Sequence, residues 1–195
     1  MKKSAFTLME LAIVIIIMSI IIGGFLNSGK AALEKKKIED TKTTLENIKQ
    51  NMISYIAVRG NLPSSNGGTA IEPLNTQAFG AKAVDNFGVP FYYDVGSQFV
   101  SADDHNICSI LTDINHTTNF PQMADDTNIS KYSVVAIILS SGKNKELDGI
   151  NNDTDRIYSM KTNRYNVLRD DIIEELTYYE VIESVCTFND FNHTR

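Results

Sequence analysis

Oxygen-bearing side chains crowd into one short segment, between Glu146 and Asp155 of the 195-residue chain. Six of these ten residues carry a carboxylate or an amide. Flexible loops of this kind supply the roughly six to eight oxygen ligands that Ca²⁺ takes. The spacing differs from that of an EF-hand, because no glycine follows the Asp153-x-Asp155 pair at the required place. The expected calcium ligands are Asp148, Asn151, Asp153 and Asp155. The alternative is a solvated turn rich in Asx residues.

The two cysteines, Cys108 and Cys186, are too few for a disulfide-rich scaffold or a multi-cysteine zinc module. A bridge between them would join positions 78 residues apart. In an oxidising compartment such a bridge would stabilise the fold by about 4 kcal/mol in the chain-entropy model. The alternative is two buried, unpaired thiols. We expect the bridge, because a lone thiol is reactive in that compartment.

No catalytic arrangement is visible. His105, His116 and His193 lie in polar stretches without metal-ligand spacing, and the chain has no Gly-x-Ser-x-Gly motif. The chain has 18 Lys and Arg against 24 Asp and Glu, a net charge of -6. This balance argues against a protein that coats nucleic acid. We expect a protein that is not an enzyme and has no cofactor other than calcium.

An apolar segment begins close to the N-terminus. Over residues 11–22 the only polar residue is Ser19. As a helix, residues 6–26 would rise about 31 Å, roughly the thickness of the hydrocarbon core of a bilayer. Lys2 and Lys3 precede the segment. The positive-inside rule places these lysines in the cytoplasm and everything after the segment on the far side of the membrane.

The start of this segment carries a specific motif. Phe-Thr-Leu-x-Glu at residues 6–10, with a short basic leader before it and the apolar run after it, closely resembles the class III signal of type IV pilins and type II secretion pseudopilins. The resemblance covers residues 2–22. It implies that a prepilin peptidase cuts between Ala5 and Phe6, and that the new amine of Phe6 is N-methylated. Ala5 departs from the glycine that usually precedes the cut.

The same resemblance implies a role for Glu10. A carboxylate inside an apolar span is costly unless it is neutralised or paired. Cleavage leaves a positively charged amine on Phe6, which must lie in an apolar environment once the N-terminal helices pack into a filament. Glu10 of a neighbouring subunit would neutralise that amine, and losing one member of such a buried pair is strongly destabilising. We therefore expect Glu10 to act in assembly.

Behind the apolar span the sequence predicts a helix and then a sheet. Apolar residues recur mostly at spacings of three, four or seven from Leu33 to Ile56, and Gly60 follows, which predicts an amphipathic helix over residues 27–60. Residues 176–188 fit a strand pair or a helix. The clearest strands are expected at residues 91–93, 132–139 and 157–160. The expected fold class is α+β, a long N-terminal helix packed on a small antiparallel sheet, as in pilins.

The expected organisation follows from these elements. It is a leader at residues 1–5, a membrane-spanning or filament-core helix at 6–26, its amphipathic continuation at 27–60, and an extracytoplasmic β-rich domain at 61–195. The resemblance implies a single-pass inner-membrane protein with its C-terminal domain in the periplasm. Its expected partners are other pilin-like subunits, prepilin peptidase and the inner-membrane assembly platform.

The expected function is that of a structural subunit, which assembles through its N-terminal helix into a type II secretion pseudopilus or a type IV pilus. The alternative is a tip or minor pilin that acts as an adhesive or DNA-uptake module. The acidic balance of the chain weighs against DNA.

Overall fold

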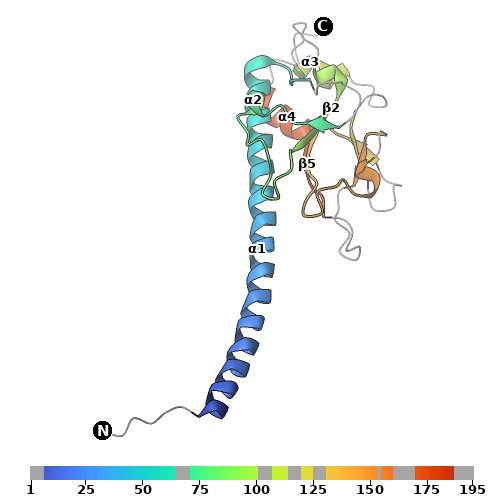
Figure 1. The fold of residues 1–195 in the computed structure, drawn as a ribbon. Helices are drawn as coiled ribbons and strands as arrows, with labels where there is room; N and C mark the ends of the chain where they lie inside the picture. The colour runs from blue at the N-terminus through green and yellow to red at the C-terminus, as the bar shows by residue number, and fades with distance from the viewer. Residues whose placement is uncertain are drawn as a thin grey trace. The chain divides into compact units, whose positions relative to one another are not determined.

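The computed structural model of the protein describes two compact units, Met1–Glu39 and Asp40–Arg195 (Figure 1). The described residues are 7–64, 71–100, 107–113, 120–124, 131–152, 155–159 and 170–186.

Helix α1 runs from Leu8 to Arg59 and contributes to both units. In the second unit its apolar face is buried, with side chains three or four positions apart, as an amphipathic helix requires. These side chains are Leu45, Ile48, Met52 and Ile56. The helix ends where the sequence predicts, because Gly60 adopts φ 72° and donates its N–H to the Ile56 carbonyl at 2.7 Å.

The larger sheet has four antiparallel strands in the order β1-β2-β5-β7. Its central strand β5 is buried at every position, which agrees with its nearly apolar sequence. The Phe91-Tyr92-Tyr93 run leads into β2, as predicted. The strands are β1 (Glu72–Pro73), β2 (Tyr92–Val95), β5 (Ala136–Ser140) and β7 (Ile172–Leu176).

A second sheet corrects two expectations. Its strand order is β4-β3-β6, and β3 pairs with β6 in parallel, so the strands are not all antiparallel. The prediction of a single strand at 132–139 is also wrong, because this segment forms two strands, β4 and β5, which belong to different sheets. The chain changes partner at the break, where Val134 N–H donates to the Pro121 carbonyl and Val135 N–H to the Leu176 carbonyl. The strands are β3 (Gln122–Ala124), β4 (Lys131–Ser133) and β6 (Ile157–Ser159).

The ambiguous segment 176–188 contains a helix over most of its described part. Helix α4 (Tyr178–Val185) begins with a capping box, in which Thr177 and Glu180 satisfy each other's backbone N–H groups. A disulfide joins Cys108 of α3 (Ile107–Asp113) to Cys186, the C-cap of α4, with 5.7 Å between the Cα atoms. This is the expected bridge. The other short helices are α2 (Thr76–Phe79), η1 (Ser97–Phe99) and η2 (Gly149–Asn152).

A buried ion cluster ties α1 to the sheet and to α4. The Lys49 ammonium, with a side chain 10% exposed, contacts Glu174 of β7, Glu180 of α4 at 3.1 Å and Glu46 at 3.2 Å. Burial by itself disfavours the charged ammonium, but the bonds to Glu174 and Glu180 outweigh it and raise the pKa of Lys49. The C-terminal part of α1 is therefore integral to the second unit, which begins at Asp40 and not after residue 60. The α+β class with a long helix and an antiparallel sheet is as expected.

Candidate functional site

The first turn of α1 is closed by a capping box. The Thr7 hydroxyl accepts the N–H of Glu10 at 3.3 Å, and Glu10 Oε2 accepts both the N–H and the hydroxyl of Thr7 at 2.9 Å. Thr-x-x-Glu is the sequence signature of this arrangement. Sequence reasoning gave Glu10 a role in assembly, with the chain's own Phe6 amine as a partial partner before assembly. It missed the hydrogen bonds with Thr7, although the spacing between the two residues is visible in the sequence. Ala5 and Phe6, the expected cleavage site, lie outside the described residues.

Apolar side chains surround the next turns of the helix. Ile15, Ile16 and Ile17 are 57%, 60% and 52% exposed, and large apolar residues stay exposed as far as Ile22. Successive helical residues point about 100° apart, so these side chains face every direction. Helices that are apolar on all sides are buried, either in the core of a large protein or in a membrane. The surface of residues 8–22 thus lacks the polar face that a water-facing helix presents.

Within the described part of the chain, which omits the side chains of residues 24–28, no helix is both long enough and apolar enough to cross a membrane.

A second candidate site lies beside the loop that follows β5. One oxygen each of Asp148, Asp170 and Asp171 lies within 4.8 Å of the others. Asp170 and Asp171 come just before β7, and the antiparallel pairing places Ser140, at the end of β5, opposite Ile172, at the start of β7. The strand pairing therefore brings two distant segments to the same edge of the sheet. We call these three carboxylates the aspartate cluster.

Backbone amides of the loop hold the cluster in place. Asp170 Oδ2 accepts the N–H groups of Lys143 and Asn144, the latter at 2.8 Å, and Asp170 donates its own N–H to Asp148 Oδ2 at 2.9 Å. Gly142 makes this approach possible, because it adopts φ 62° and any Cβ there would lie 2.1 Å from the Asp170 carbonyl oxygen.

Asp171 is the most deeply buried member of the cluster, with 4% of its surface exposed. Its Oδ2 accepts the N–H of Asp148 at 2.9 Å and the side-chain amide of Asn151 at 2.8 Å. Its Oδ1, like Oδ1 of Asp170, is buried without a hydrogen-bond partner among the described residues. Burial raises the pKa of Asp171 to about 6 and also raises the pKa of Asp170.

This arrangement suits a divalent cation. Buried carboxylates need a counter-charge or a proton, and Ca²⁺ prefers carboxylate oxygens from loops that can adapt to it. Two of the three carboxylates also offer a buried oxygen that no described donor satisfies. The residues that are present therefore fit calcium better than a solvated turn, in which these oxygens would face water.

The structure brings together only part of the expected ligand set. Asp148 belongs to the cluster, whereas Asn151 contacts it as a donor and uses its oxygen to accept the Ser159 N–H at 2.9 Å. Asp155 is not in the cluster, and its Oδ1 accepts the Ile157 N–H at 2.8 Å. Asp153 lies outside the described residues. Sequence reasoning missed Asp170 and Asp171, although two adjacent aspartates before a β-prone run were a visible signal.

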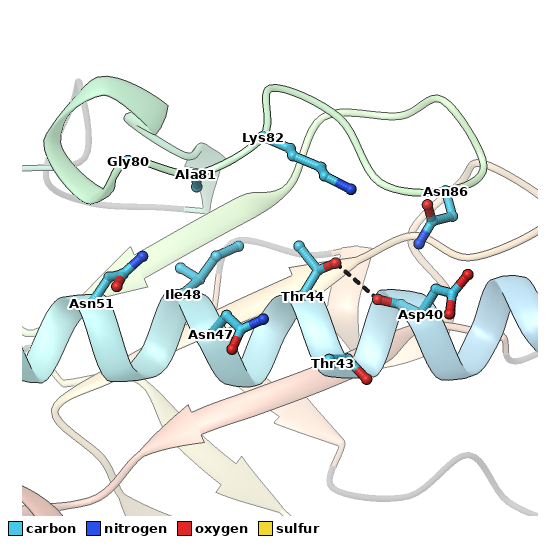
Figure 2. Close-up of a pocket in the computed structure, with 10 residues that line it drawn as sticks. All are labelled: Asp40, Thr43, Thr44, Asn47, Ile48, Asn51, Gly80, Ala81, Lys82 and Asn86. Atoms are coloured by element: carbon cyan, nitrogen blue, oxygen red, sulfur yellow. Dashed lines mark hydrogen bonds between the residues drawn. The ribbon is translucent and has the colours of Figure 1, made fainter.

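A polar hollow of about 400 Å³ lies between α1 and the segment around residues 80–86, as Figure 2 shows. Three of its polar side chains already donate hydrogen bonds. Asn51 donates to the Phe79 carbonyl at 2.9 Å, Asn86 to the Thr41 hydroxyl at 3.3 Å, and Thr44 to the Asp40 carbonyl at 2.8 Å. The first two of these contacts hold the segment on the helix.

Comparisons of the chain with family models, with curated proteins and with solved structures find no match.

Proposed function

We propose that the protein is a structural subunit that assembles through its N-terminal helix into a filament of the type II secretion pseudopilus or type IV pilus kind. One observation carries this proposal: residues 8–22 form a helix whose large apolar side chains are exposed on every side. Burying one such side chain fully stabilises by about 1.5–3 kcal/mol. A lipid environment before assembly, and packed copies of the same helix after it, would both cover this surface.

The resemblance of residues 2–22 to a prepilin signal supports the proposal independently. It supplies the route from membrane to filament, in which the leader ends at Ala5 and the mature chain begins at Phe6. In this proposal the apolar segment at residues 6–26 anchors the chain in the inner membrane before assembly, and the second unit lies in the periplasm. The disulfide supports that location, because such bonds persist in oxidising compartments.

Glu10 has two successive roles in this proposal. In the single chain its carboxylate accepts two hydrogen bonds from Thr7 at the positive end of the helix dipole. In the filament the same carboxylate also faces the amine of Phe6 from a neighbouring copy. A carboxylate has enough lone pairs to keep the cap and accept the amine. The cap therefore makes the intramembrane acid tolerable until a partner arrives.

Mass spectrometry of the mature N-terminus tests the proposal. The full chain is expressed in a bacterium that has a prepilin peptidase, and the protein is purified from the membrane fraction. We expect the first residue to be N-methylated Phe6. An intact Met1, or a cut after Gly24 as in an ordinary secretory signal, would contradict the assignment.

A second candidate function is calcium binding by the aspartate cluster. The observation that favours it is the buried, unpartnered Oδ1 of Asp171 beside two further carboxylates. Calcium would there neutralise buried charge and fix the loop between β5 and η2 against the start of β7. We propose Asp148, Asp170 and Asp171 as its ligands.

A further inference from the structure

The charges of the chain are divided unevenly between the two units. The unit Met1–Glu39 contains six lysines and three glutamates, a net charge of +3. The unit Asp40–Arg195 contains the other twelve basic and 21 acidic residues, a net charge of -9. The proposed cut after Ala5 removes Lys2 and Lys3, so the first unit of the mature chain keeps four lysines and three glutamates, a net charge of +1 before the new N-terminal amine is counted. The first unit is then weakly basic and the second strongly acidic, so opposite units of two copies attract each other.

The positive charge outside the leader is concentrated on one stretch of α1. We call Lys30, Lys35, Lys36 and Lys37 the lysine collar. All four are exposed, and the three consecutive lysines point about 100° apart around the helix. Lys30, Lys35 and Lys36 form no ion pair within the described residues. Leu33 and Ile38 lie on the same stretch and are 64% and 37% exposed, so residues 30–38 present apolar as well as basic side chains.

A groove of about 410 Å³ on the second unit has the matching character. It lies between α1 and β7, and we call it the β7 groove. The half-buried Ile173 supplies accessible apolar lining beside the buried Leu45 and Ile172, and Glu46 and Glu174 supply carboxylates. The Glu46 side chain is 48% exposed and available to a partner.

The charge of this groove is not fully compensated within one copy. Glu46, Glu174 and Glu180 share the single ammonium group of Lys49. The groove lining itself holds two carboxylates, Glu46 and Glu174, and one ammonium group, Lys42. A further cation from outside would balance the groove.

We propose that residues 30–38 of α1 from one copy dock in the β7 groove of a second copy. Lysines of the collar pair with Glu46 and Glu174, while Leu33 and Ile38 contact the apolar lining. This inference rests on the proposed function, because it supplies the contact between subunits that lies beyond the apolar helix. Exposed charges are screened over about 10 Å at 0.1 M salt, so the contact is salt-sensitive.

Zero-length cross-linking of sheared filaments tests the docking. A carbodiimide joins a lysine amine directly to a carboxylate, and filaments assembled from a mixture of ¹⁴N- and ¹⁵N-labelled chains distinguish links between copies from links within one. We expect mixed-isotope peptides that join Lys35 or Lys36 to Glu46 or Glu174. Links between copies that involve other carboxylates only, or none from the collar, overturn the docking.

Charge reversal provides the second arm of the test. We expect Lys35→Glu with Lys36→Glu to reduce the chain in sheared filaments at least tenfold, and added Glu46→Lys to restore it in part. Lys35→Arg with Lys36→Arg keeps the charge, so filaments persist while these cross-links disappear. Lys82→Glu, the same charge change at an exposed residue outside the collar, serves as the control and is expected to assemble.

The outcomes separate this inference from the proposed function. If wild-type filaments form and the double reversal assembles equally well, the docking alone is overturned. The same holds if the double reversal is lost from the membrane fraction itself, because the collar then binds anionic lipid. If the wild-type chain enters no filament, the proposed function fails and the docking fails with it.

Discussion

The charge of the Asp171 carboxylate depends on the groups beside it. The side chain is almost fully buried next to Asp148 and Asp170, with one oxygen bonded twice and the other unpartnered. A bound cation or a bound proton can each remove the unfavourable charge. A bound cation makes stability depend on calcium, whereas a bound proton makes it depend on pH. Each possibility gives a prediction for Asp171.

Calcium should stabilise the folded chain through Asp171. A ligand at a hundred times its Kd stabilises by about 2.7 kcal/mol, which raises the Tm of a protein of this size by about 5–10 °C. We expect this rise on replacing EDTA with Ca²⁺ during thermal unfolding of the detergent-solubilised full chain, and its loss in Asp171→Asn. Asp155→Asn, which changes a carboxylate outside the cluster, should keep it. Equal shifts in both variants would refute the cluster as the site.

Without calcium, Asp171 should make stability depend on pH. Its folded pKa of about 6 lies above the ordinary value of 3.8, because burial disfavours the charged form. The native state therefore binds more protons than the unfolded state between these values, so the free energy of unfolding falls as pH rises from about 4 to 6. We expect a fall of about 1–3 kcal/mol in denaturant titrations in EDTA. Asp171→Asn should reduce it; an identical slope in the variant would contradict this assignment.

At the scale of elements, β7 connects the parts of the second unit. Its start carries the aspartate cluster, its third residue Glu174 contacts Lys49 of α1, and Glu175 accepts the Tyr132 hydroxyl of β4 at 2.8 Å. One strand thus joins the aspartate cluster, the long helix and the second sheet. Removing the charge that holds it to α1 should destabilise the whole unit.

Lys49→Met tests that connection. The substitution leaves Glu46, Glu174 and Glu180 without their shared ammonium. Because these side chains are 48%, 29% and 37% exposed, water compensates part of the lost interaction, and the expected cost is about 1–3 kcal/mol. We expect a loss of this size in the free energy of unfolding. Lys42→Met, on the exposed part of the same helix, should change stability by no more than about 0.5 kcal/mol. If the two variants unfold alike, the cluster does not hold α1 to the sheet.

Local signals were readable from the sequence, whereas distant contacts were not. The end of α1 at Gly60 and the amphipathic face around Met52 follow from residue type and spacing. The pairing of β5 with β7 does not, because nothing in the local pattern of Asp170 and Asp171 specifies that they meet Asp148. The apolar run at 132–139 likewise concealed a break at Val134, since both halves are apolar and only their partners differ.

In the whole molecule, the N-terminal helix exposes apolar and basic side chains that have few partners within a single copy. Residues 8–22 present large apolar side chains on every side, and the lysine collar that follows places basic side chains around the helix, with Glu34 and Glu39 between and beside them. A contact with one partner would need only one face of the helix. Surfaces that extend around it fit a subunit enclosed by several copies of itself, which is the central claim of the proposed function.

Glu10→Gln tests this claim most directly, with Thr7→Ala as its matched control. Glutamine can still close the capping box but carries no charge for the neighbouring Phe6 amine, whereas Thr7→Ala weakens the cap and keeps the charge. The measurement is the amount of each cleaved chain in sheared filament fractions relative to the membrane. We predict that Glu10→Gln is inserted and cleaved normally but absent from filaments, while Thr7→Ala assembles. Wild-type amounts of Glu10→Gln in the filaments would contradict assembly through this charge.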